Sequence, residues 1–257
     1  MKDIYKKIAI EAALESGLFI KNSVGKIKNI SYKGKDNIVT DVDKKAEGMI
    51  IKKILSVFPE HSILSEERRP KLGDSPYKWL VDPLDGTTNF AHSFPFFCVS
   101  VALELNGAIV LGVVYDPMRD ELFYAEAGKG AYLNKSRIRV SHVGKLCAGF
   151  LATGFSYGQS RKDRNVKHFR KLLARSLAVR RAGSAALDLS YVACGRFDGF
   201  WEMDLHPWDS AAGVVIVREA GGAVTRFNGS QFTPYDKEIL ATNGHIHKQI
   251  SGLISRT

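Results

Sequence analysis

Asp82 and Asp85 stand three positions apart on either side of Pro83, and their types and spacing suit chemistry. An apolar run at residues 79–81 comes directly before the pair and is typical of a strand. Because functional groups of α/β proteins collect where strands end, we expect Asp82 to lie at the end of this strand. Pro83 restricts the backbone so that both carboxylates and the Leu84 carbonyl can face one side. Such a set of oxygen atoms suits a hard cation such as Mg²⁺.

The Gly-Thr-Thr segment after the pair, residues 86–88, can begin a helical turn whose N–H groups face an anion. Two further acidic motifs bear on the same chemistry. Glu66 and Glu67 follow a short apolar run, and Asp209 lies at the predicted start of a helix, where a carboxylate gains from the helix dipole. Each motif alone also fits a structural role, as a turn former, a solvated face or a helix N-terminal acid.

Together these segments resemble the inositol monophosphatase family of Mg²⁺-dependent, lithium-sensitive phosphatases. The resemblance rests on Glu66-Glu67, on the string DPLDGTTNF at residues 82–90, and on Trp208-Asp209-Ser210 running on to the paired glycines at residues 221–222. It extends over nearly the whole chain, from residue 37 to those glycines, and the DPLDGTTNF string is highly specific.

The resemblance implies an α/β (α+β) fold, a layered αβαβα sandwich of the sugar-phosphatase type. Residues 1–257 would form a single unit with two lobes, about 1–142 and about 143–257, and the active site would lie between the lobes. Members of the family are often homodimers, so the resemblance implies a homodimer as well.

The resemblance also implies a role for each acidic residue. Two or three Mg²⁺ ions would be held by oxygen atoms of Glu66, Asp82, Leu84 (through its backbone carbonyl), Asp85 and Asp209. Glu66 and Thr87 would orient the water that attacks phosphorus, and with Asp85 they are the predicted catalytic residues. One metal would generate hydroxide near neutral pH while another stabilises the leaving alkoxide. Glu67 and Asp43 would support these groups from behind.

On the substrate side, the resemblance implies contacts to both halves of a phosphate ester. The backbone N–H groups of Gly86 and Thr87 would hold the phosphate oxygens. Ser184 and Ala185 would approach the alcohol part of the substrate, and Glu202 would form hydrogen bonds with its hydroxyl groups.

The implied function is a Mg²⁺-dependent phosphomonoesterase that hydrolyses inositol monophosphate to inositol and phosphate. Two features leave the substrate open. Ser65 replaces the family's common glycine before the two glutamates, and Arg180-Arg181 could reach a second phosphate or a subunit interface. A fructose-1,6-bisphosphatase or a dual-specificity sugar phosphatase is therefore the enzymatic alternative. In either case the partner is a small phosphorylated polyol or sugar.

The net charge of +10, from 37 Lys and Arg against 27 Asp and Glu, also points to polyanionic partners. Residues 161–181 carry nine basic residues and a single acid, Asp163. Binding of RNA or of a transcription complex through this segment is the non-enzymatic alternative. A solvated basic face is the simpler explanation, because Phe169 is the one aromatic residue within the run.

Composition and hydropathy exclude several classes of protein. A chain that is 45% hydrophobic and 25% charged is an ordinary globular protein rather than a disordered chain or a coiled coil. No apolar run approaches the ~18–20 residues of a membrane span, and the N-terminal residues lack the apolar core of a signal peptide. The spacing of the three cysteines, without a C-x-x-C pair, predicts small buried hydrophobes in a reducing cytoplasm: Cys98, Cys147 and Cys194.

The motifs require helices and strands that position them. Apolar residues at helical spacing predict helices at residues 4–19, 41–57, 164–175, 185–193, 207–220 and 245–254. Strands are predicted at residues 79–81, 96–105, 108–115, 121–125, 150–152, 177–179 and 197–201. Turn signals at Asn106-Gly107 and Asp116-Pro117 join the second, third and fourth of these strands into an antiparallel meander.

Overall fold

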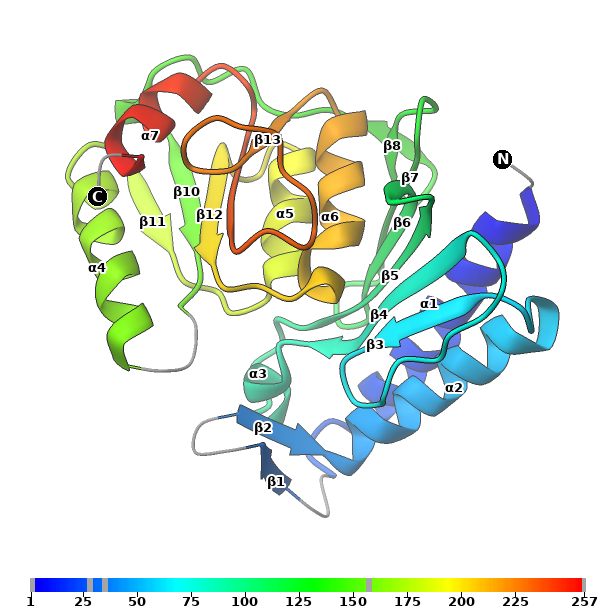
Figure 1. Cartoon of the computed structure of the whole chain (residues 1–257). Helices are drawn as coiled ribbons and strands as arrows, with labels where there is room; N and C mark the ends of the chain where they lie inside the picture. The colour runs from blue at the N-terminus through cyan, green and yellow to red at the C-terminus, as the bar shows by residue number, and fades with distance from the viewer. Residues whose placement is uncertain (1–2, 27–29, 34–36, 156–158, 256–257) are drawn as a thin grey trace.

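The computed structural model describes residues 3–26, 30–33, 37–155 and 159–255, which are arranged in layers (Figure 1). The first layer holds two helices, α1 (Asp3–Ser23) and α2 (Asp41–Val57). Thr40 caps α2, since its hydroxyl accepts a hydrogen bond from the Val42 N–H while its own N–H donates to the Asp43 carboxylate. The apolar faces of both helices pack against one side of a large sheet.

A seven-stranded sheet forms the second layer. Its strands, in spatial order, are β3 (Ser62–Ser65), β4 (Tyr77–Asp85), β5 (Cys98–Leu105), β6 (Ala108–Asp116), β7 (Glu121–Glu126), β8 (Ala131–Leu133) and β9 (Ser136–Ile138). Only β3 and β4 are parallel among these neighbours, and the predicted meander of β5, β6 and β7 is confirmed. Asn106 and Gly107, with φ values of 49° and 84°, make the tight turn between β5 and β6.

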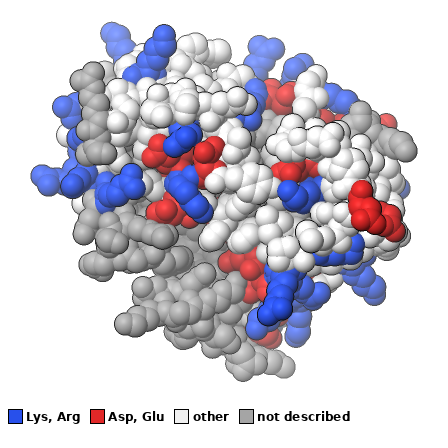
Figure 2. All heavy atoms as spheres, viewed as in Figure 1, with Lys and Arg blue, Asp and Glu red and all other residues white. Residues whose placement is uncertain are grey.

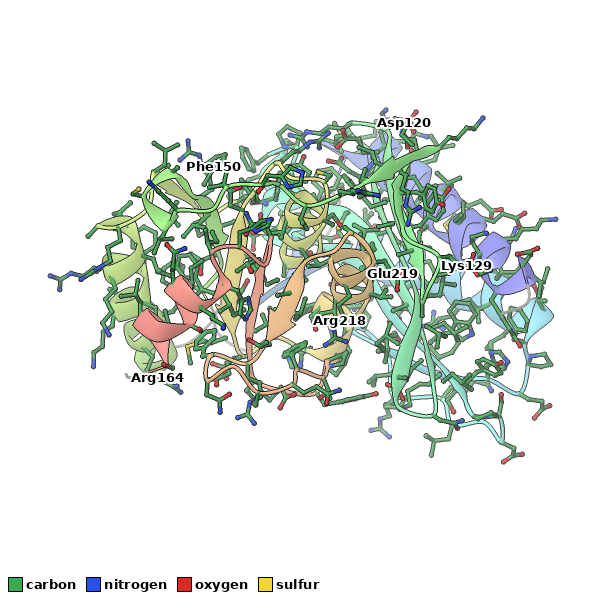
Figure 3. The ribbon with its side chains drawn as sticks, turned by 90° about the horizontal axis from the view of Figure 1, so that it is seen from above. Asp120, Lys129, Phe150, Arg164, Arg218 and Glu219 are labelled. Carbon is green, nitrogen blue, oxygen red and sulfur yellow. The ribbon has the colours of Figure 1, made fainter. Side chains whose placement is uncertain are left out.

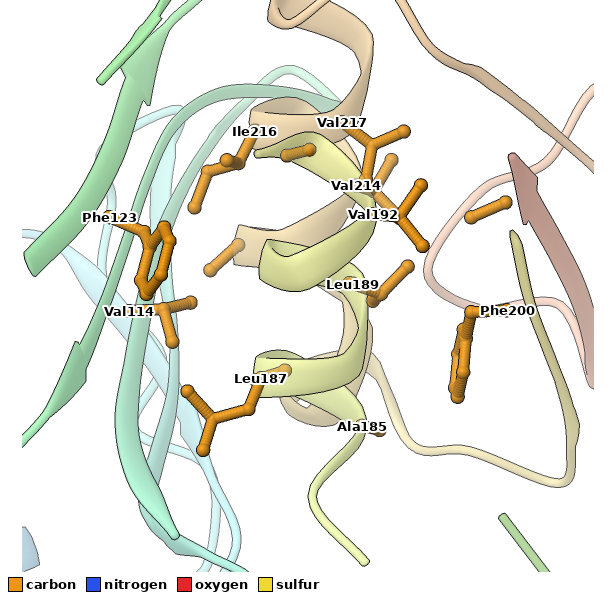
Figure 4. Packing of buried hydrophobic residues seen from close by; sticks show 14 of the residues in the cluster. Val114, Phe123, Ala185, Leu187, Leu189, Val192, Phe200, Val214, Ile216 and Val217 are labelled. Atoms are coloured by element: carbon orange, nitrogen blue, oxygen red, sulfur yellow. The ribbon is translucent and has the colours of Figure 1, made fainter. Parts of the chain in front are cut away.

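The third layer consists of two buried helices, α5 (Ala185–Ala193) and α6 (Pro207–Glu219). A Cβ added to Gly112 of β6 would lie 2.5 Å from the Ala212 carbonyl oxygen, so a glycine is needed for α6 to approach the sheet this closely. Figure 4 shows Val114 and Phe123 of the sheet on one side of the helices and Phe200 on the other. Apolar residues on both sides of this layer therefore belong to one core.

A five-stranded sheet and two outer helices complete the layers. The strands, in spatial order, are β11 (Ala178–Arg180), β10 (Phe150–Thr153), β12 (Gly199–Met203), β14 (Glu238–Thr242) and β13 (Ala223–Thr225). The outer face is covered by α4 (Gln159–Leu173) and α7 (His247–Ile254). The predicted layered αβαβα sandwich is confirmed.

The C-terminal end of α6 is fixed to the turn between β7 and β8. The Glu219 carboxylate accepts hydrogen bonds from the N–H groups of Gly128 and Gly130, at 2.8 and 2.7 Å. Figure 3 shows Glu219 beside the turn that carries Lys129. Because α6 is anchored at this end and packed between two sheets, its first turn, which carries Asp209, has a defined position.

The prediction that Asp82 ends a strand is wrong. β4 continues to Asp85, and its pairing with β5 changes register between Asp82 and Asp85. Pro83 has no N–H to donate to the ladder, so the strand accommodates it through this irregularity. A short helix, α3 (Thr87–Ala91), then follows.

Cys147 contradicts the prediction that all three cysteines are buried. It is exposed on a 3₁₀ turn (Leu146–Ala148), where Leu146 takes the buried position, whereas Cys98 is buried and Cys194 is half-buried. Several short strands were not predicted, including the hairpin of β1 (Ile30–Lys33) and β2 (Asn37–Thr40). Among the described residues, no helix has both the length and the apolar character required to cross a membrane.

Candidate active site

The ends of β4, β10 and β12 and the starts of α3, α5 and α6 surround a cavity of about 310 Å³. Most of the predicted site residues line this cavity: Glu66, Asp82, Leu84, Asp85, Gly86, Thr87, Ser184, Ala185, Glu202 and Asp209. Glu67 and Asp43 do not line it, and their place behind the other groups stays a prediction. The fold thus gathers residues that lie far apart in the sequence into one cavity.

The turn from β4 into α3 depends on Gly86, whose φ of 96° lies in the left-handed region. A Cβ at this position would lie 2.9 Å from a neighbouring carbonyl oxygen, so a side chain does not fit. Thr87 Oγ1 lies 2.9 Å from the Leu84 carbonyl oxygen and 3.0 Å from Asp43 Oδ1, either of which can accept its proton. Asp43 is held in turn by the cap of α2, since its Oδ2 accepts a hydrogen bond from the Thr40 N–H at 2.8 Å.

Asp82 and Asp209 carry carboxylates in an unfavourable environment. Asp82 is 2% exposed, and burial raises the pKa of its carboxyl well above the usual range. The charges of Glu66, Asp85 and Asp209 raise this pKa further. Asp209 Oδ2 accepts a hydrogen bond from the His206 N–H at 2.7 Å, yet burial and then the charge of Asp85 raise the pKa of Asp209 well above its usual range. These carboxylates therefore repel one another.

Asp85 is held by the first turn of α5. Its Oδ2 accepts hydrogen bonds from the Ser184 hydroxyl and from the Ala186 N–H, both at 2.7 Å. Burial raises the pKa of Asp85 to about 6, although these hydrogen bonds act in the opposite direction. Ser184 also caps α5, since its Oγ accepts a hydrogen bond from the Leu187 N–H at 3.4 Å. The Ser184 hydroxyl is thus engaged in orienting Asp85, and its contact with a substrate stays a prediction.

The chemistry of the donor set fits a divalent cation. Among the residues that the structure describes, no three acidic, histidine or cysteine side chains are already arranged so that they could hold a metal ion. Nevertheless the cavity presents carboxylate oxygens and the Leu84 carbonyl, which are the ligands that hard cations prefer. The carboxyl groups raise each other's pKa, so a cation among them would remove an electrostatic penalty that the protein itself leaves in place.

The cavity also contains Glu202, a residue of β12 that is 9% exposed. Burial, and then the charge of Asp85, raises the pKa of Glu202 to about 8, while the charge of Arg181 opposes the shift. Gly154 provides the space, since a Cβ at this position would overlap the Glu202 carboxylate. Arg181 lines the cavity as well, whereas the guanidinium of Arg180 lies over the ring of Phe150, 4.9 Å from its centroid.

Asp188 is a cavity residue that the sequence interpretation missed. It lies in the first turn of α5, is 1% exposed and lines the cavity. Burial raises the pKa of Asp188 well above its usual range, and the charges of Glu202 and Asp85 raise it further. The signal that could have identified it is a single acid within the otherwise uncharged helix AALDLSYVA.

A layered αβαβα sandwich with a carboxylate-lined cavity beside its central helices defines the class of metal-dependent sugar phosphatases. The chain belongs to the Inositol monophosphatase family, whose sequence model matches residues 1–256. This membership makes it a phosphoric monoester hydrolase of a metal-dependent family.

Curated proteins and a solved structure are similar to this chain over nearly its whole length. An inositol-1-monophosphatase from Synechocystis sp. is 46% identical over 255 residues, which cover 98% of this chain and 88% of the relative. A Nus factor SuhB from Salmonella typhimurium is 44% identical over 245 residues, with 94% and 92% covered. The crystal structure of extragenic suppressor protein suhB from Bartonella henselae has a TM-score of 0.95 at 41% identity, with 98% of this chain and 99% of that chain covered.

Proposed function

We propose that the chain is a Mg²⁺-dependent phosphomonoesterase that hydrolyses inositol monophosphate to inositol and phosphate. The observation that carries the proposal is the single cavity that contains every predicted metal ligand, with carboxyl groups that raise one another's pKa. The similarity to an inositol-1-monophosphatase at 46% identity supports the choice of substrate.

The proposed ligands for two or three Mg²⁺ ions are Glu66, Asp82, the Leu84 carbonyl, Asp85 and Asp209. When bound, the ions would supply an activated water nucleophile and stabilise the charge that develops on the leaving oxygen. Asp85 keeps its orientation because Ser184 and Ala186 donate to one of its oxygens, which leaves the other oxygen for a ligand bond.

Thr87 and Glu66 orient the attacking water in this proposal. The Thr87 hydroxyl donates its proton to the Leu84 carbonyl or to Asp43, so its lone pairs remain free to accept a hydrogen bond from water. Asp43 fixes this arrangement from behind, because the cap of α2 holds it in place. The N–H groups of Gly86 and Thr87 at the start of α3 would hold the phosphate oxygens.

The alcohol half of the substrate lies against Glu202, Ser184 and Ala185 in this proposal. Glu202 has a raised pKa of about 8, so at neutral pH it can both donate and accept hydrogen bonds to hydroxyl groups. Each hydroxyl group of a polyol can likewise donate and accept a hydrogen bond, which supports an inositol ring as the leaving group.

Measurement of phosphate release with and without Mg²⁺ tests the proposal. Asp85→Asn and Asp209→Asn should each abolish Mg²⁺-dependent release while the circular dichroism spectrum stays that of the wild type. Asp198→Asn is the matched control, since Asp198 is a buried acid that does not line the cavity, and it should retain turnover. Retained turnover in both cavity variants would contradict the proposed ligand set.

A fructose-1,6-bisphosphatase or dual-specificity activity remains the second enzymatic candidate, and the position of Arg181 favours it. Arg181 lines the cavity and could bind a second phosphate, whereas the guanidinium of Arg180 lies over the ring of Phe150. Comparison of kcat/KM for inositol 1-phosphate and fructose 1,6-bisphosphate decides between them. If the bisphosphate is a substrate, Arg181→Gln should lower its kcat/KM more than that of inositol 1-phosphate.

A non-enzymatic activity, binding of RNA or a transcription complex through residues 161–181, has a separate basis. Relatives called Nus factor SuhB are 44% identical to this chain, and Arg164, Lys167 and Arg170 are exposed on α4. The side chains of Arg161, Lys162 and Asp163 lie outside the described part of the chain. Figure 2 shows Lys and Arg side chains scattered mostly near the outline of the described surface in this view. Affinity for RNA that falls steeply with salt would support this activity, and absence of binding at low salt would end it.

Assembly and location complete the proposal: one unit with two lobes, a homodimer, in the cytoplasm. The seven-stranded sheet ends at Ile138 and the five-stranded sheet begins at Phe150, which supports a lobe boundary near residues 142–143. Light scattering combined with size exclusion tests the dimer.

A further inference from the structure

One oxygen of Asp188 is buried without a hydrogen-bond partner among the described residues. This atom is Oδ1. Several buried side-chain atoms in the described part of the chain have no hydrogen-bond partner, and among them only Asp188 Oδ1 belongs to a residue that lines the cavity. Its position in the first turn of α5 lets the helix dipole favour the charge, but the dipole supplies no hydrogen bond to this oxygen. A buried polar atom left unpaired costs about 1–3 kcal/mol, so a role outside stability is needed to explain it.

A well-bonded acid elsewhere in the core shows what Asp188 lacks. Asp198 is 5% exposed, and both of its oxygens accept hydrogen bonds, Oδ1 from the Ser141 hydroxyl and Oδ2 from the Phe150 N–H at 2.7 Å. Asp188 is equally enclosed, yet the charged groups that influence it most are Glu202 and Asp85, which repel it. Only Arg181 attracts it among the charges that act on it in the described structure.

The chemistry of the unpaired oxygen restricts what can occupy its position. An unpaired carboxyl oxygen can accept a hydrogen bond, and a phosphate group would be repelled by the charged acids that act on Asp188. A hydroxyl group is the complementary neutral donor. Glu202, the residue proposed to contact the alcohol half of the substrate, lines the same cavity, and its charge acts on Asp188.

We propose that Asp188 is a specificity-determining residue whose Oδ1 accepts a hydrogen bond from a second hydroxyl of the substrate's alcohol, next to the hydroxyl that Glu202 binds. The inference rests on the proposed phosphatase function and narrows its substrates to esters of polyhydroxylated alcohols. A site built to bond a hydroxyl discriminates strongly against analogues without one, because its buried oxygen is then left unpaired.

Two variants separate the acceptor oxygen of Asp188 from its charge. Asp188→Asn removes the charge and keeps a carbonyl oxygen, whereas Asp188→Leu removes both at similar volume. The substrates are inositol 1-phosphate and 4-nitrophenyl phosphate, whose leaving group has no second hydroxyl. We expect Asp188→Leu to lower kcat/KM for inositol 1-phosphate by about 10- to 100-fold, mainly through KM, and to change it less than about 3-fold for 4-nitrophenyl phosphate. Asp188→Asn should retain more of the preference for inositol 1-phosphate than Asp188→Leu.

Thermal unfolding gives a second readout that does not depend on turnover. Asp188→Leu should unfold at the same temperature as the wild type or a higher one, because an unpaired buried oxygen is removed. The control Asp198→Asn should unfold at a lower temperature and leave the ratio of kcat/KM between the two substrates unchanged.

Several results would overturn the inference. Asp188 would have a structural or general electrostatic role if Asp188→Leu lowered kcat/KM equally for both substrates. The same conclusion would follow if the Asn and Leu variants had equal preferences for inositol 1-phosphate, or if the unfolding temperature of Asp188→Leu fell clearly. A wild-type protein that hydrolyses neither ester with Mg²⁺ would instead contradict the proposed function, and the inference would fall with it.

Discussion

Asp82 and Asp116 are both buried aspartates of the seven-stranded sheet, at 2% and 0% exposure, but their partners differ. Asp116 Oδ1 accepts hydrogen bonds from the N–H groups of Met118 and Arg119, at 2.9 and 3.1 Å. Its other oxygen forms an ion pair with the Arg119 guanidinium at 2.8 Å. Asp82 accepts one backbone hydrogen bond and otherwise faces the charges of other acids.

The acids of the cavity differ in the same way from other buried acids, which have partners of opposite charge. Glu126 is 4% exposed and forms ion pairs with Lys6 at 2.7 Å and Lys129 at 2.9 Å. Glu104 is 5% exposed and pairs with Lys78 at 2.9 Å. These three acids, Asp116, Glu126 and Glu104, are therefore each paired with a cationic side chain of the protein. In the cavity, by contrast, the charged groups that act most on Asp82 and Asp209 are other acids, and binding of a cation or a proton would relieve their repulsion.

Asp82→Asn gives the largest expected effect on activity. It removes one of the proposed metal ligands, so kcat for phosphate release should fall on the order of 10³-fold or more. Because the substitution also removes a buried charge that its neighbours repel, the metal-free protein should be at least as stable as the wild type. Phosphate-release assays measure the fall in kcat. Calorimetry with and without Mg²⁺ measures the stability, since added Mg²⁺ should raise the unfolding temperature of the wild type and not that of the variant. If Mg²⁺ still stabilised the Asp82→Asn variant, the proposed difference between Asp82 and the other buried acids would be wrong.

The pH dependence of stability in the absence of metal should report on Glu202. Its folded pKa of about 8 lies above the unfolded value, so between about pH 4.3 and 8 the folded state holds a proton that the unfolded state has lost. The contribution of Glu202 to the free energy of unfolding therefore falls as pH rises through this window and becomes constant above it. The slope is on the order of 1.4 kcal/mol per pH unit.

Denaturant titrations at several pH values, with EDTA present, measure this slope. Glu202→Gln should show a shallower fall in stability with pH than the wild type. An unchanged slope in the variant would mean that other groups account for the pH dependence.

Asp116→Ala should show the opposite balance between stability and activity. It leaves the N–H groups of Met118 and Arg119 without an acceptor, so the free energy of unfolding should fall by about 2–3 kcal/mol. Since Asp116 does not line the cavity, kcat/KM should stay within about 2-fold of the wild type at a temperature where both are folded. Urea titrations and phosphate release provide the two measurements. A loss of activity without a loss of stability would contradict the division between the two groups of acids.

The residues that line the cavity could be predicted because their signals are local. DPLDGTTNF sets a strand, a glycine turn and a helix start within nine residues, and the structure places all of these together at the cavity. The helix at residues 185–193 has the predicted bounds because Ser184 caps it and Gly195 follows it. Asp82 was misplaced, since a proline usually ends a strand and the register change that tolerates Pro83 has no sequence signal.

Long-range packing explains what could not be predicted. β13 and β14 are short, and β14 pairs with β12, which lies more than thirty residues earlier, so neither strand has a local pattern of its own. Asp188 looks like an ordinary polar residue near a helix start. It becomes a buried cavity residue only because α5 lies between two sheets, an arrangement that depends on the whole chain.

Glu126→Gln has the smallest expected effect on stability. The pH dependence that Glu126 contributes has the opposite sign to that of Glu202. Burial alone would raise the pKa of Glu126, but the hydrogen bonds from Lys6 and Lys129 outweigh burial and lower it. The folded state therefore binds fewer protons, and the stabilisation present at neutral pH is lost as pH falls below about 4.3. Both lysines reach solvent, so screening limits the contribution to less than about 1 kcal/mol.

Denaturant titrations at pH 7 and pH 3.5 measure this contribution. The free energy of unfolding should differ less between the two pH values for the Glu126→Gln variant than for the wild type, while the slope between pH 5 and 8 that belongs to Glu202 stays unchanged. A change in that slope would mean that the fold acids and the cavity acids are coupled, because Glu126 should act independently of the cavity.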